Sequence, residues 1–169
     1  GQSGHALQRA AQGVSTSPVE PFSATKSVGR ETTFEQDLLD WKQIGRILFS
    51  LAERALYALR EKQMETRCVT LKVRYSDFST CTFAKTLPDP TCIDADIHDA
   101  LRGLIPKAQK NQAPVRLIGI TLSSLTHKQH QLPLFGGERS QRWERVLESA
   151  DHIRDRYGLE SLRFARSMD

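Results

Sequence analysis

The apolar residues of this chain follow two different periods, which predict where its helices and strands lie. Across residues 41–62, apolar side chains recur at the 3.6-residue spacing of an amphipathic helix, at Ile44, Leu48, Leu51, Ala52, Ala55 and Leu59. Asp40 precedes this run and is followed by Gln43, a spacing that predicts a capping box. A second helix is predicted to open at Thr91-x-x-Asp94. Its predicted buried face consists of Ile93, Ile97, Leu101, Leu104 and Ile105.

Between these helices the period changes to two, which is typical of strands with one buried face. In residues 67–75, one side of the predicted strand carries Val69, Leu71, Val73 and Tyr75. Ser76-Asp77 predicts a tight turn, and residues 78–87 predict the return strand. Pro88-Asp89-Pro90 is predicted to end that strand, because proline cannot donate to a sheet ladder.

Two further strands bracket this set. Residues 26–34 form a β-branched first strand, in which Gly29 indicates either a bulge or a close approach of the backbone to a ligand. A turn is expected at residues 37–40, and residues 115–125 form the last strand. The order β-α-β-β-α-β over residues 26–126 predicts an α+β domain of the ferredoxin-like, split βαβ type, with a four-stranded antiparallel sheet and two helices on one face.

The segments before and after this domain are predicted to contain helices and a linker but no strand of the sheet. A short helix ends at Gly13, so that residues 1–13 read as the end of a preceding domain, and residues 14–25 read as an extended, proline-containing linker. Residues 138–169 form a helical tail. Its apolar stripe is Trp143, Val146, Leu147, Ala150, Ile153 and Tyr157. The sequence leaves open whether this helix docks on the domain, on another domain or on a partner.

The charge and composition of the chain limit the kinds of partner, metal site and catalytic site that it can have. The net charge of +4 permits a polyanionic partner. The three cysteines, Cys68, Cys81 and Cys92, are not spaced like those of a disulfide framework or of a zinc site. His127 and His130 have no further cysteine or histidine nearby that could complete a metal site. We therefore expect no metal or cofactor in this chain. We find no catalytic constellation, membrane-spanning run or signal peptide, and expect a cytoplasmic protein without a membrane partner.

The sheet face that the helices leave open is the candidate binding surface. Its predicted members are small, hydroxylated or basic, with no carboxylate: Ser27 or Arg30, Thr70, Lys72, Arg74, Thr80, Thr82, Ala84, Leu117, Gly119, Thr121 and Ser123. Such a face suits a phosphate backbone, although a merely solvated face is the alternative. The face has no pair of aromatic residues for stacking unpaired bases, which favours duplex contact over single-strand contact.

The segment Gln131-Leu132-Pro133-Leu134-Phe135 is an apolar run that suits neither a helix interior nor a central strand. It reads as an extended peptide, within residues 127–137, that presents apolar side chains to a partner or to the chain's own core.

These features together resemble the C-terminal part of a Y-family translesion DNA polymerase of the bacterial DNA polymerase IV type. Residues 4–13 look like the end of the thumb domain of that family, and residues 26–34 are similar to the signature that enters its little finger domain. Residues 78–87 and 115–120 resemble the third and fourth strands of the little finger. Residues 131–135 resemble the peptide by which bacterial polymerases bind the sliding clamp.

The resemblance implies that this region holds template–primer DNA on the open sheet face and tethers the polymerase to the sliding clamp. The implied DNA contacts are Lys26, Ser27, Gly29, Arg30, Thr80, Thr82, Lys85, Arg116, Gly119 and Thr121. To these the composition of the face adds Lys72 and Arg74. The implied clamp contacts are Gln131, Leu132, Leu134 and Phe135. Leu117 and Thr121 stand where family members often place arginine, so contact from the last strand is expected to be weaker.

The resemblance also implies that the parent protein is a DNA polymerase whose palm domain holds magnesium. The palm is not in this chain, so we expect this piece to bind DNA without polymerising it. Two alternatives stay open: a clamp- and DNA-binding adaptor from a catalytically inactive relative, and a ferredoxin-like protein-interaction module with no role on DNA.

Overall fold

The computed structural model describes residues 2–15, 18, 24–128 and 138–167. The helices and strands follow one another in the predicted order. Their bounds are α1 Gln2–Ala11, β1 Ser27–Leu38, α2 Trp41–Glu61, β2 Met64–Tyr75, β3 Thr80–Thr91, α3 Asp94–Gln109, β4 Val115–His127 and α4 Glu138–Tyr157, followed by the short 3-10 helices η1 Leu159–Ser161 and η2 Ala165–Ser167.

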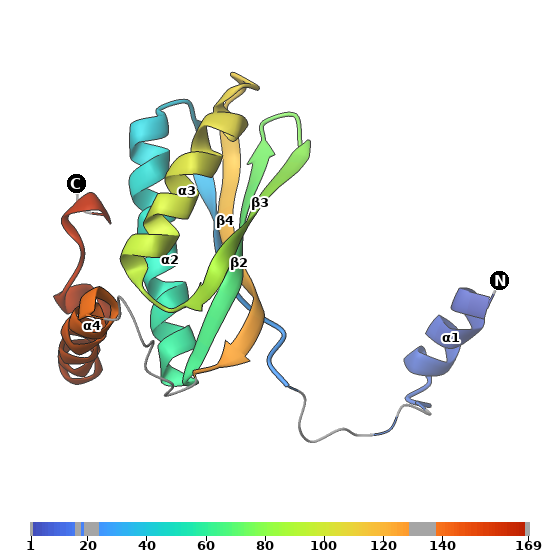
Figure 1. The fold of residues 1–169 in the computed structure, drawn as a ribbon. Helices are drawn as coiled ribbons and strands as arrows, with labels where there is room; N and C mark the ends of the chain where they lie inside the picture. The colour runs from blue at the N-terminus through green and yellow to red at the C-terminus, as the bar shows by residue number, and fades with distance from the viewer. Residues whose placement is uncertain (1, 16–17, 19–23, 129–137, 168–169) are drawn as a thin grey trace.

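The four strands form one antiparallel sheet in the order β1-β4-β2-β3. β4 lies between β1 and β2, and β2 lies between β4 and β3, so each β-α-β unit is split by an inserted strand. Helices α2 and α3 both cover the same face of the sheet (Figure 1). The predicted α+β architecture is therefore confirmed, and β1 and β3 are its edge strands.

The core lies between the two helices and the sheet. Val69, Leu71 and Val73 of β2 are fully buried, as the period-two pattern predicted. Tyr75 closes one end of the core, where its hydroxyl donates a hydrogen bond of 2.7 Å to the carbonyl of Ala108. Burial of each large apolar side chain stabilises the fold by about 1.5–3 kcal/mol, so the sheet and helices hold one another in place.

The first strand differs from its prediction in two ways. β1 continues to Leu38, which pairs with Val115, so the turn expected at residues 37–40 is wrong; an irregularity between Thr33 and Leu38 lets the strand continue. Gly29 is not in a bulge, because it pairs in register with Thr121. A Cβ atom at Gly29 would lie 3.2 Å from the carbonyl oxygen of Ile120, which shows that the close approach is to β4.

The predicted bounds of the third strand, residues 78–87, are also wrong at both ends. β3 continues through Pro88 and Pro90 to Thr91, because an edge strand has one unpaired side on which a missing N–H costs little. It begins at Thr80 rather than at Phe78, which lies instead in the preceding turn with a positive φ of 63°.

Both helices begin close to their predicted starts, but the hydrogen bonds at their N-termini differ from those predicted. Asp40 is the N-cap of α2, but its side chain accepts from the N–H of Lys42, at 2.8 Å, rather than from Gln43. Asp94 does not cap α3; it is almost fully buried, with 1% of its surface exposed. Thr91 supports this turn by accepting from the N–H of Ile93 at 3.1 Å.

Candidate nucleic-acid interface

The strand register defines the open face of the sheet. Directly opposite residues of an antiparallel pair share a face, so four rows can be followed across β1, β4, β2 and β3. The rows are Ser27–Ser123–Cys68–Thr86, Gly29–Thr121–Thr70–Ala84, Glu31–Gly119–Lys72–Thr82 and Thr33–Leu117–Arg74–Thr80. We call these residues the open face. Eight of the predicted DNA contacts lie on it: Ser27, Gly29, Lys72, Arg74, Thr80, Thr82, Gly119 and Thr121.

Four of the predicted cationic contacts lie outside these rows: Lys26 directly precedes β1, Arg116 lies where the β2–β4 register shifts, and Arg30 and Lys85 lie on the other side of the sheet. Arg30 is opposite Ile120 and Lys85 is opposite Val69, and both of these partners are buried in the core. By strand alternation, Arg30 and Lys85 therefore belong to the helix-covered side, at the two edges of the sheet. Both remain exposed because edge strands are not covered there, but the structure does not bring them into the open face.

A carboxylate does lie on the open face, contrary to the prediction. Glu31 follows Ser27 and Gly29 on the same side of β1, and its Oε2 lies 2.8 Å from Nζ of Lys72. Gly119 lies between these two residues in the row, and a Cβ atom there would be only 2.7 Å from Cβ of Glu31. The glycine thus provides the space that Glu31 occupies, and the ion pair neutralises part of the positive charge that was expected.

Two arginines lie near the end of the open face beside the β2–β3 turn: Arg74 in its last row, and Arg116, which directly precedes Leu117 of that row. Nε of Arg74 donates to the hydroxyl of Thr80 at 2.9 Å. Arg116 places its guanidinium carbon 4.8 Å from the centre of the Phe78 ring. Its Nη1 is also 3.7 Å from Oδ1 of Asp37. The sequence pointed to Arg74 and Arg116 separately, but their neighbourhood depends on the hairpin and on the start of β4.

The predicted clamp contacts Gln131, Leu132, Leu134 and Phe135 lie outside the described residues. The chain is anchored just before this segment, where the backbone N–H of Lys128 donates to the carbonyl of Gln63 at 2.9 Å. Nζ of Lys128 is also 3.2 Å from Oε2 of Glu144 on α4.

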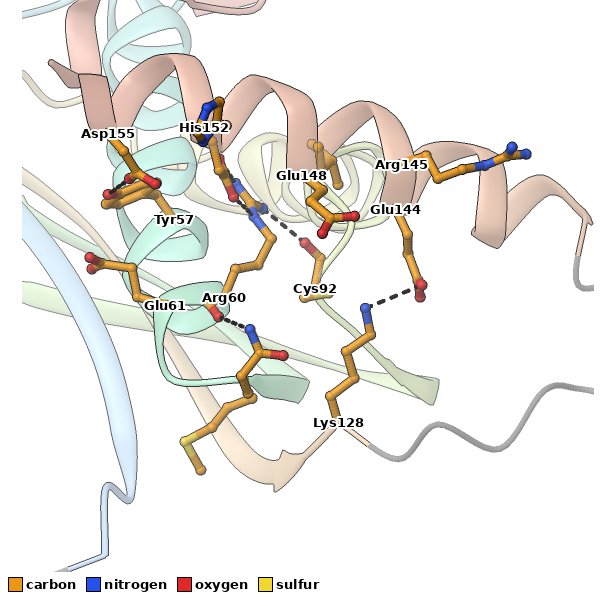
Figure 2. Close-up of a pocket in the computed structure, with 14 residues that line it drawn as sticks. Tyr57, Arg60, Glu61, Cys92, Lys128, Glu144, Arg145, Glu148, His152 and Asp155 are labelled. Atoms are coloured by element: carbon orange, nitrogen blue, oxygen red, sulfur yellow. Dashed lines mark hydrogen bonds and ion pairs between the residues drawn. The ribbon is translucent and has the colours of Figure 1, made fainter. Parts of the chain in front are cut away.

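The C-terminal helix α4 docks on the outer side of α2, which answers the question the sequence left open (Figure 1). Arg60 of α2 carries the contact. Its Nε and Nη2 donate to the two oxygens of Asp151 on α4, at 2.5 and 3.0 Å, and its Nη1 donates to Asp94 on α3, at 2.8 Å. Nη1 of Arg154 donates to Asp151 at 2.8 Å. Figure 2 shows the surroundings of Arg60.

Only part of the predicted apolar stripe of α4 is used in this contact. Leu147 and Ala150 are buried, but Val146, Ile153 and Tyr157 are 49%, 40% and 66% exposed. The helix is rotated so that charged residues, Asp151 and Arg154, share the docked side with the small apolar ones. A stripe derived from hydrophobicity alone could not have included them.

A groove of about 860 Å³ lies between α4 and the ends of α2 and β2 (Figure 2). Acidic side chains outnumber cations in its lining, with five carboxylates: Glu61, Glu144, Glu148, Asp151 and Asp155. The cations of the lining are Arg60, Lys128 and Arg145, of which the first two are paired with carboxylates. This excess of negative charge disfavours the approach of a polyanion to the groove.

Burial is the main cause of the pKa shifts of several carboxyl and thiol groups that the structure describes. Burial raises the pKa of Cys92 to about 11, which keeps its thiol protonated at neutral pH. Burial also raises the pKa of Glu53 and of Asp94, the latter against the attraction of Arg60. Within the described part of the chain no three His, Cys, Asp or Glu side chains are grouped to hold a metal ion. None of the helices described there is long and apolar enough to cross a membrane.

Known proteins match both the sequence and the fold. Residues 25–134 match the impB/mucB/samB family C-terminal domain. The DNA polymerase IV of Desulfatibacillum aliphaticivorans is 35% identical over 161 residues, covering 94% of this chain and 41% of that protein. The DNA polymerase IV of Halorhodospira halophila is 36% identical over 129 residues, covering 76% of this chain and 36% of that protein.

This chain therefore spans about two fifths of the length of these relatives. A solved structure of a DinB family error-prone DNA polymerase from Sulfolobus solfataricus is similar in fold, with a TM-score of 0.51 and 19% identity. The alignment covers 72% of this chain and 36% of that one.

Proposed function

Because the chain belongs to the impB/mucB/samB family of C-terminal domains, the little finger domain of Y-family DNA polymerases, we propose that it holds template–primer duplex DNA on its open face. The observation that carries this proposal is the character of the face. Its rows present hydroxyl groups, exposed backbone at Gly29 and the cations Lys72 and Arg74, with Glu31 as the one carboxylate in those rows. Hydroxyls and backbone groups position a phosphate backbone, and the cations supply salt-dependent attraction.

The Glu31–Lys72 ion pair gives this proposal a directional test. Glu31→Gln frees Lys72 and removes a negative charge, so affinity for duplex DNA should rise about threefold to tenfold at low salt. Lys72→Ala should weaken binding to all duplex sequences alike and lower the salt slope by about one. Lys107→Ala, an exposed cation on the helix-covered side, is the matched control and should leave binding within about twofold.

Fluorescence anisotropy with labelled duplexes of two unrelated sequences, over a range of salt concentration, measures these effects. Absence of any duplex affinity in low salt would refute DNA binding by this domain and favour the protein-interaction alternative. A loss in Lys72→Ala for only one of the two sequences would contradict backbone recognition.

We further propose that residues 131–135 bind the sliding clamp, with Leu134 and Phe135 as apolar anchors and Gln131 and Leu132 completing the contact. Extended peptides with a few apolar anchors are an established mode of recognition. The double substitution Leu134→Ala and Phe135→Ala should abolish capture of the chain by an immobilised bacterial clamp. Unchanged capture would rule out this segment as the tether.

For the parent protein we propose DNA-directed DNA polymerase activity, which is supported by the name DNA polymerase IV of its relatives. We further propose that it acts past damaged templates, in the cytoplasm. Magnesium would be held by a palm domain, and the carboxylates described here offer no such cluster. A primer-extension assay with this chain alone should give no product. Paired acidic residues in the palm would distinguish a polymerase from an inactive adaptor.

A further inference from the structure

The turn between β2 and β3 contains an unusual choice of residue. The N–H of Phe78 donates to the carbonyl of Tyr75, and the N–H of Tyr75 donates to the carbonyl of Ser79, both at 3.0 Å. Asp77 stabilises the turn by accepting from the N–H of Ser79 at 2.9 Å. This is a tight hairpin connection whose last loop residue has a left-handed backbone, and that position normally holds glycine or asparagine.

Phe78 occupies that position with φ of 63°. An L side chain with a Cβ atom is disfavoured there, and phenylalanine has no polar side-chain group that could hydrogen-bond the local backbone in compensation. Packing does not explain it either, because 65% of Phe78 is exposed. A strained and exposed aromatic residue, where the turn itself asks for a smaller one, indicates a function outside the fold.

The surroundings of Phe78 indicate what it binds. The guanidinium carbon of Arg116 lies 4.8 Å from the centre of the ring, so the ring and the cation form one stacked unit. The neighbouring row of the open face contributes Arg74, which reaches Thr80 at the start of β3. An exposed aromatic plate beside cations is the combination with which proteins bind unpaired bases.

We propose that Phe78, stacked with Arg116, binds an unpaired base of the single strand that continues beyond the duplex held on the open face. This inference rests on the proposed function, since the duplex brings the single strand to the turn. It also refines the expectation that the domain favours duplex. The open face itself has no aromatic pair, but the turn at its end supplies one plate, sufficient for a single base.

The test compares two ligands with the same chain. One is a fluorescein-labelled blunt duplex, and the other is the same duplex with a short single-stranded extension. The wild-type chain should bind the extended ligand more tightly, because one base stacks on Phe78. Phe78→Ala and Phe78→Asn should lose about 5- to 150-fold for the extended ligand, the usual range for one stacked base. Both should bind the blunt duplex within about twofold of wild type, and Phe78→Tyr should keep the preference.

Tyr157 on α4 offers a matched control. It is 66% exposed, against 65% for Phe78, and it also has an arginine over its ring, with the guanidinium carbon of Arg156 at 5.4 Å. Tyr157→Ala should leave the affinity for both ligands unchanged. Phe78→Asn should also raise the urea midpoint of unfolding, because asparagine tolerates the left-handed backbone. Weaker binding by a more stable variant cannot be due to misfolding.

The possible outcomes separate this inference from the function on which it rests. If the wild-type chain binds neither ligand, DNA binding itself is refuted. If it binds both ligands equally, or if the Phe78 variants retain the preference for the extension, the stacking site is refuted while duplex binding stands. An equal loss for both ligands would place Phe78 in the duplex contact instead. Retained DNA binding with lost capture by the clamp would identify the turn as a protein contact and overturn the proposal.

Discussion

Arg60 joins α2, α3 and α4 through a single guanidinium group, and its replacement is the most informative perturbation of the fold. Its side chain is 12% exposed, while the side chain of its partner Asp94 is 1% exposed and that of Asp151 is 16% exposed. Nη1 also donates to the backbone carbonyl of Cys92 at 3.0 Å. Arg60→Met keeps most of the aliphatic length but leaves both carboxylates without this cation.

The magnitude follows from burial. Loss of one partner of a buried ion pair costs about 3–5 kcal/mol, mainly because the other charge stays buried without compensation. Asp94 loses its ion pair with Arg60 and keeps only the weaker attraction of Arg154, whereas Asp151 keeps a direct ion pair with Arg154 at 2.8 Å. Against a total stability of about 5–15 kcal/mol for a domain, Arg60→Met should destabilise severely. The double variant Arg60→Met, Asp94→Asn removes the stranded charge and should recover at least about 1–2 kcal/mol of that loss.

The pH dependence provides a second signature. Burial already raises the pKa of Asp94, and loss of Arg60 should raise it further. An aspartate has a pKa of about 3.9 in the unfolded chain. When the folded pKa is higher, protonation favours the folded state, so the stabilisation is complete below the unfolded pKa and is lost as pH rises through the folded pKa. The deficit of Arg60→Met should therefore be larger at pH 7 than at pH 5.

Urea unfolding followed by circular dichroism measures these free energies, with the m-value as a check on two-state behaviour. The control is Arg54→Met on the same helix, because Arg54 pairs with Glu160 while their side chains are 47% and 57% exposed. Such a surface pair contributes about 0–1 kcal/mol. The reasoning is refuted if Arg60→Met costs no more than Arg54→Met, or if Asp94→Asn fails to restore stability in the Arg60→Met background.

Two further predictions concern other buried positions. Burial raises the pKa of Glu53, so the stabilisation from its protonation is complete below about pH 4 and is lost as pH rises through the raised pKa. In Glu53→Gln, the urea midpoint of unfolding should therefore fall less as pH rises. A pH profile identical to that of the wild type would contradict this prediction. Gly119→Ala should cost about 1–3 kcal/mol because the new Cβ would lie 2.7 Å from Cβ of Glu31. Gly103→Ala on α3, with nothing within 4 Å, should gain up to about 1 kcal/mol in thermal unfolding; equal effects at both glycines would refute the steric argument.

Much of the fold could be predicted because it depends on local periods. The alternation of Val69, Leu71 and Val73 identified β2 and its buried side, and the 3.6-residue spacing identified α2. The prolines of β3 misled the prediction, because their cost depends on whether the strand is central or at an edge. That distinction is a property of the whole sheet.

The candidate site was predicted less completely, for a related reason. Arg30 and Lys85 were grouped with the open face by their charge and by resemblance, whereas the register sets both opposite core residues. Glu31 was omitted because the side of β1 that faces outward was undecided between Ser27 and Arg30. Phe78 was assigned to a strand, and its left-handed turn gave no signal in composition.

The sequence by itself determined the type and order of the elements, the split βαβ fold, and a small, hydroxylated and basic character for much of the open face. Only the tertiary structure decided the pairing of Lys72 with Glu31, the stacking of Arg116 on Phe78 and the contacts of Arg60 with Asp94 and Asp151. Periodicity reports on which side of its own element a residue lies, and the period is set by backbone geometry that repeats locally. Arg60 contacts Asp94 at a sequence separation of 34 positions and Asp151 at a separation of 91. Such contacts depend on which elements become neighbours in the fold, and no local period encodes that.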